Sequence, residues 1–186
     1  MKKILLILLM CTLANVSNAQ SLNENWEEEV TNSLYEFMAC DDPLDDISPC
    51  NKFVGEALKM VYGIHDFYDE EKERYLLANE IADFLAKEDK WTLLGKGSEQ
   101  SALNEAQGYA NLGKAVVAVL KSNSGHGHVA IILPGESGPS SAWGLNVPNS
   151  ASFFIYKPES SYIGKKLSYA FKSKNKGNVL LYGRNY

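Results

Sequence analysis

The chain has few of the residues that hold metal ions: its 186 residues include 3 cysteines and 3 histidines. His126 and His128 have a spacing at which one strand can offer two ligands, but no third ligand is evident, and His65 stands alone. The aspartates between positions 41 and 46 lack the spacing of an EF-hand loop. We therefore expect no metal and no other cofactor.

The sequence also lacks internal repeats, low-complexity tracts and proline-rich linkers. A chain of this length and hydrophobicity is sufficient for one core. We therefore expect residues 20–186 to form a single domain, and we expect that domain to be a monomer.

Residues 1–19 are typical of an export signal. Lys2 and Lys3 precede an uncharged apolar run over 4–13, and Ser17-Asn18-Ala19 is a small-residue cleavage site. The apolar run is too short for a membrane anchor. An alternative is a lipoprotein acylated at Cys11, although Met10 is large for the position before such a cysteine. We expect cleavage after Ala19, a secreted or periplasmic protein and no membrane attachment afterwards.

Charge argues against nucleic acid as the main partner. The net charge is −5, and it becomes more negative without Lys2 and Lys3. Basic residues gather in the second half, notably at Lys165-Lys166 and over 172–176. These residues either bind an anionic polymer locally or form a solvated surface.

Apolar spacing divides the chain into a helical half and a strand half. Helices are predicted from residue 26 to a stop at Asp41-Asp42-Pro43, from Pro49 to Gly63, over 69–87, and over 101–112 before Gly113. Strands are predicted over 115–120, 128–133, 141–147, 152–156 and 179–182. Helices followed by an antiparallel meander predict an α+β fold.

Cys50 and His128 form the pattern that carries most chemical information. Cys50 follows Pro49 at the predicted start of a helix, and His128 opens an apolar strand 78 residues later. A thiol attacks an amide carbonyl as its thiolate, and both a helix N-terminus and a neighbouring imidazole lower a thiol's pKa. The pair therefore favours a cysteine nucleophile with a histidine base.

Cys50 and the run His128-Val129-Ala130-Ile131 resemble the papain-like superfamily of NlpC/P60 and CHAP peptidoglycan hydrolases, over roughly residues 45–156. In these families the nucleophile begins a core helix packed on an antiparallel sheet, and the base opens a strand with this pattern. The resemblance implies a secreted cysteine amidase or endopeptidase acting on peptidoglycan stem peptides. The interval between the two residues is longer than usual there, and the acidic segment 69–87 accounts for it as an insertion.

The resemblance also implies a third residue that orients the base from a later strand. Asn146 is our choice, and Asn149 is either a second candidate or a loop-forming residue. His126 is expected in the turn at the cleft rim, where it would contact substrate. Trp143 either lines the cleft or fills the core.

Two other functions fit the same residues. A Cys40–Cys50 disulfide, which export permits, would make the protein a secreted non-catalytic binding or inhibitor module. Alternatively, a papain-like enzyme could act on ordinary proteins or transfer acyl groups.

Overall fold

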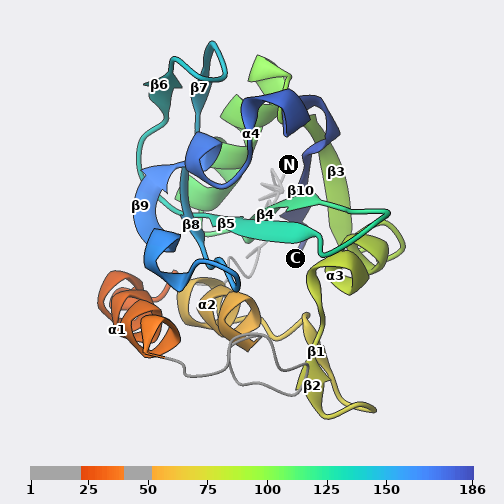
Figure 1. The fold of residues 1–186 in the computed structure, drawn as a ribbon. Coiled ribbons are helices and arrows are strands. Elements are labelled where there is room, and N and C mark those ends of the chain that lie inside the picture. Colours follow the sequence, from red (N-terminus) through yellow and green to blue (C-terminus); the bar gives the residue numbers. More distant parts are fainter. Residues whose placement is uncertain (1–21, 40–51) are drawn as a thin grey trace, which may run out of the picture.

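The computed structural model describes residues 22–39 and 52–186. Its fold is α+β, as the sequence predicts: a six-stranded antiparallel sheet with helices packed around it (Figure 1). The strand order is β3-β10-β4-β5-β8-β9. These strands span Trp91–Lys96 (β3), Leu180–Arg184 (β10), Val116–Leu120 (β4), His128–Ile132 (β5), Asn149–Ser152 (β8) and Tyr162–Lys166 (β9).

The remaining elements surround this sheet. The helices are α1 (Trp26–Met38), α2 (Phe53–Tyr62), α3 (Ala78–Leu85) and α4 (Gln100–Asn111). Two short hairpins pair β1 (Tyr68–Asp69) with β2 (Arg74–Tyr75), and β6 (Gly138–Ser140) with β7 (Leu145–Val147). Short 3-10 segments cover Pro158–Ser160, Leu167–Tyr169 and Ser173–Asn178.

Helices α1 and α2 pack on one face of the sheet. Phe153, the residue after β8, lies with its ring centroid 5.4 Å from Phe37 of α1 and 6.0 Å from Phe53 of α2. Helix α3 joins the same layer through Phe84, which contacts Phe67, whose ring stacks on Trp91 of β3. Aromatic contacts therefore hold the N-terminal helices against the sheet.

Helix α4 covers the other face at close range. A β-carbon added to Gly183 in β10 would lie 2.8 Å from the ring of Tyr109, so the helix can approach only because that position is glycine. Gln107 of α4 donates to the carbonyl of Leu133 at 2.9 Å and accepts from the backbone N–H of Asn149 at 2.8 Å. One buried amide therefore ties the ends of β5 and β8 together.

The predicted helix over 69–87 is wrong in its first half, where β1 and β2 form a hairpin and α3 begins only at Ala78. Asp69 accepts hydrogen bonds from the backbone N–H groups two and three residues later, which closes a turn. The helix then starts where Glu80 accepts from the backbone N–H of Leu77. The charged residues between these points have no apolar face to bury, so local side-chain bonds determine the backbone there.

Helices α1, α2 and α4 fall where apolar spacing places them, and α2 ends at Gly63 in the left-handed conformation that the sequence predicts. The predicted stop at Asp41-Asp42-Pro43 and the predicted helix start at Pro49 lie outside the described residues. Strands β3 and β9 were not predicted, because each mixes apolar with lysine and glycine residues. Strand β8 begins three residues earlier than its prediction and ends at Ser152. The expected signal segment 1–19 lies outside the described residues.

Asp66 joins the end of β10 to the start of β3. Its carboxylate accepts from Arg184 at 2.6 and 3.2 Å and from the indole N–H of Trp91 at 3.0 Å. Both members of the ion pair are largely withdrawn from solvent, with side-chain exposures of 13% and 17%. Removal of Asp66 would leave a guanidinium and an indole N–H without this acceptor.

We predict that Asp66→Ala lowers the free energy of unfolding by about 2–3 kcal/mol in urea titration. Asp83→Ala is the matched control, since Asp83 pairs with Lys121 where both side chains are about half exposed. That control should lose less than about 1 kcal/mol. Equal small losses in the two variants would show that the Asp66 cluster contributes no more than a surface pair.

Candidate active site

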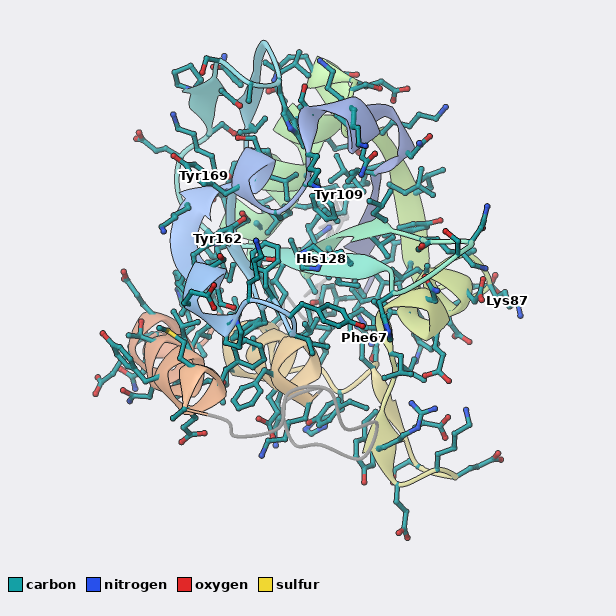
Figure 2. All side chains as sticks on the ribbon, viewed as in Figure 1. Phe67, Lys87, Tyr109, His128, Tyr162 and Tyr169 are labelled. Carbon is teal, nitrogen blue, oxygen red and sulfur yellow. The ribbon has the colours of Figure 1, made fainter. Side chains whose placement is uncertain are left out.

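A cleft of about 810 Å³ lies at the end of the sheet where β5 begins and β8 ends. Its walls come from Val54 of α2, residues 76–81 at the start of α3, residues 125–129 and residues 153–157. Tyr162, Lys165 and Tyr169 line it as well. Figure 2 shows His128 at the sheet, with Tyr162 and Tyr169 on the side of β9.

His128 is the first residue of β5, and its imidazole is fixed on several sides. Its Nε2 lies 2.7 Å from the hydroxyl oxygen of Ser152 in the neighbouring strand. The ring of Phe154 stacks on the imidazole at 4.6 Å, and Phe171 meets it edge-on at 5.3 Å. Among the described residues, no hydrogen bond reaches Nδ1, so this nitrogen is the one available for chemistry.

Desolvation sets the protonation state of this imidazole. Burial between the aromatic rings lowers the pKa of His128 from 6.5 to about 4. The ring is therefore neutral at pH 7, and a neutral imidazole is the form that accepts a proton. A negative charge close to Nδ1 would raise this pKa again.

The imidazole and α2 approach the cleft from opposite faces of the sheet. Ser152 shares the imidazole's face, whereas Phe153, the next residue, points to the other face and stacks on Phe53 of α2. Val54, near the start of α2, and His128 nevertheless both line the cleft.

Asn79 of α3 holds the turn that precedes His128. Its side-chain amide donates to the carbonyls of Ser122 and Gly125 at 3.0 and 3.1 Å, and its oxygen accepts from the N–H of Ser122 at 3.0 Å. A β-carbon on Gly127 would lie 2.4 Å from the Asn79 oxygen, so the turn fits against α3 only with glycine at that position. The turn therefore has a fixed position relative to α3.

Of the predicted site residues, His128 and His126 lie at the cleft. The imidazole of His126 is exposed and meets the ring of Tyr156 edge-on at 5.3 Å. Cys50, the predicted nucleophile, and Cys40, its alternative disulfide partner, lie outside the described residues. Whether these two cysteines are paired stays a prediction.

The other three predicted site residues, Asn146, Asn149 and Trp143, do not line the cleft. Asn146 is exposed in β7, in the separate hairpin, where its backbone bonds to Gln100. The side chain of Asn149 donates to the carbonyl of Pro134 at 2.8 Å, which is the loop-forming role. Trp143 is 2% exposed and belongs to the core.

Sequence reasoning missed Ser152, the residue that contacts the imidazole. It lies in a run of small residues with no distinctive motif, and only strand pairing reveals it. Ala130 pairs with Ser152, so Ser152 is diagonal to His128 on the same face. A polar residue at alternate spacing in the next strand was the available signal.

Comparison with models of known protein families finds no match, and comparison with curated protein sequences finds none either. Within residues 22–39 and 52–186, no three histidine, cysteine or acidic side chains are grouped as metal ligands. No helix in that part of the chain is long and apolar enough to cross a membrane.

We predict that His128 makes folding stability fall with acidification. The unfolded chain takes up this proton below pH 6.5 and the folded chain only below about pH 4. Unfolding in that window therefore binds a proton, and stability is lost as pH falls through it. By pH 5 the loss from this group should be about 2 kcal/mol relative to pH 7.

Urea titrations of the protein and of His128→Gln at pH 7 and pH 5 measure this contribution. The difference between the two proteins isolates the imidazole from the carboxylates that titrate in both. If both proteins lose the same stability, the imidazole is not desolvated as the structure has it.

Proposed function

We propose that the protein is an exported cysteine amidase or endopeptidase that cleaves peptidoglycan stem peptides, with Cys50 as nucleophile and His128 as base. One observation carries the proposal. A neutral imidazole, fixed through Nε2, opens a strand in a cleft that the start of α2 also lines, and the predicted nucleophile lies three residues before that helix in the sequence.

Chain connectivity keeps Cys50 close to this end of α2. It precedes Lys52 by two residues, a span of at most about 7 Å. The backbone of Lys52 is already helical, with φ −74° and ψ −24°. In general, a thiol near the N-terminus of a helix feels the positive end of the helix dipole, which lowers a thiol's pKa and favours the thiolate.

The proposed reaction begins with proton transfer from the Cys50 thiol to Nδ1 of His128. The proposal requires the tautomer in which Nε2–H donates to the hydroxyl oxygen of Ser152, because that tautomer leaves the lone pair on Nδ1. The thiolate adds to the amide carbonyl, and His128 then gives its proton to the amine as the carbon–nitrogen bond breaks. Water attacks the resulting thioester, with His128 again taking a proton, and the acid and the thiol are released.

Peptidoglycan as the substrate rests on the predicted export and on the resemblance at Cys50 and His128. The cleft volume of about 810 Å³ is within the range that holds a short peptide segment. His126 and Tyr156, at its rim, are available to contact that segment.

We predict that Cys50→Ala releases no fragments from purified sacculi while its circular dichroism spectrum is unchanged, because only the reacting atom is lost. Cys40→Ala is the matched control and should retain most of the activity. Mass analysis of the released fragments also identifies the bond that is cut. Equal inactivity of the two folded variants would indicate a required disulfide and remove Cys50 as nucleophile.

We predict that Ser152→Ala lowers kcat up to about 100-fold with little change in KM, because the imidazole loses the bond that orients it. Asn146→Ala should have nearly wild-type kinetics, since its side chain is exposed in the separate hairpin. The reverse result, with Asn146 essential and Ser152 dispensable, would show that another arrangement of this end of the sheet is the active one.

A further inference from the structure

A row of aromatic rings leads from the imidazole of His128 to a lysine. The row runs from Phe154, stacked on His128, to Tyr162 at 6.4 Å and then to Tyr169 at a further 6.2 Å. The ammonium of Lys165 lies 5.7 Å from the ring centre of Tyr162 and 5.9 Å from that of Tyr169. The four residues with rings and Lys165 all line the same cleft.

Two bonds from one buried serine fix this end of the cleft. The hydroxyl of Ser150 lies 3.0 Å from the hydroxyl of Tyr162 and 2.9 Å from the carbonyl oxygen of Lys165. Tyr162 is itself buried, so its ring is a rigid support. The ammonium is therefore positioned over aromatic faces and not at the end of an unsupported side chain.

The charges around the cleft favour an anion at Lys165. Glu80 is the one acidic residue among its described lining residues, and Arg74 already holds that carboxylate at 2.7 and 2.8 Å. The hydrogen bonds from Arg74 also lower the pKa of Glu80 to about 2. Lys157 and Lys165 line the cleft without an acidic partner within 4.0 Å in the described part of the chain. The cleft thus has positive charge that the described protein leaves uncompensated.

We infer that Lys165 is a specificity-determining residue that binds a carboxylate of the peptide whose amide bond is cleaved near His128. This inference rests on the proposed function for the identity of the ligand. The rings of Phe154 and Tyr162 separate Lys165 from His128, so the carboxylate belongs to a residue beside the scissile bond and not to that bond itself.

Binding, measured separately from cleavage, tests the inference. Isothermal titration uses the full chain carrying Cys50→Ala, with a stem peptide that has free carboxylates and the same peptide with those carboxylates amidated. We expect the acid to bind about fivefold more tightly than the amide. Raising the ionic strength should reduce that preference, because the site is open to solvent.

Lys165→Met should remove the preference for the acid, and Lys165→Arg should keep it. Lys114→Met is the matched control: that ammonium also lies over a tyrosine ring, 5.0 Å from the centre of Tyr109, but it is outside the cleft. Two results would overturn the inference. One is equal affinity for the acid and the amide when Lys165 is intact, and the other is an equal loss of the acid preference in Lys165→Met and Lys114→Met.

The hydrolase assignment and the carboxylate site at Lys165 can fail independently of each other. If the protein with Cys50 intact cleaves no stem peptide but still binds the acid more tightly through Lys165, the carboxylate site stands and the hydrolase assignment is wrong. If the protein cleaves acid and amidated peptides at the same kcat/KM, and Lys165→Met changes neither, the hydrolase stands and the carboxylate site is wrong.

Discussion

The register of β5 between β4 and β8 is the constraint on which the rest of this structure depends. Side chains alternate along a strand, so a slip of one residue would turn His128 to the opposite face and part it from Ser152. Gln107 pins the register at the far end of the two strands by bonding to Leu133 and Asn149. A buried amide on α4 therefore governs where an imidazole at the other end of the sheet can point.

The alternation of side chains along β5 and β8 also determines which helices pack on each face of the sheet. One face of β5 and β8 carries Phe153, which meets α1 and α2, and the other carries the small residues Ala130, Ser150 and Ser152 beside His128 and its aromatic neighbours. The cleft lies at the end of the sheet where β5 begins and β8 ends, and α2 and α3 supply part of its walls. Val54 of α2 and His128 of β5 both line it although their elements pack on different faces of the sheet.

The sequence predicts those parts of the fold that local spacing determines. Helices α1, α2 and α4 bury regular apolar faces, and β4 and β5 are continuous apolar runs, so their periodicity suffices. The turn at Asp69 depends on one side chain bonding to nearby backbone, which apolar spacing does not report. Ser152 was missed and Asn146 preferred for a related reason. Residue type suggested the asparagine, whereas proximity to His128 is set by pairing between strands distant in sequence.

Strand β10, the last in the described chain, lies inside the sheet between β3 and β4. Residues 91–96 and 116–120 pair only with β10 on their facing sides, so neither edge is satisfied until residues 180–184 arrive. Strand β3 therefore joins β4, β5, β8 and β9 only through a segment about 60 residues beyond β4, and such distant pairing makes completion of the six-stranded sheet slow relative to formation of the local hairpins.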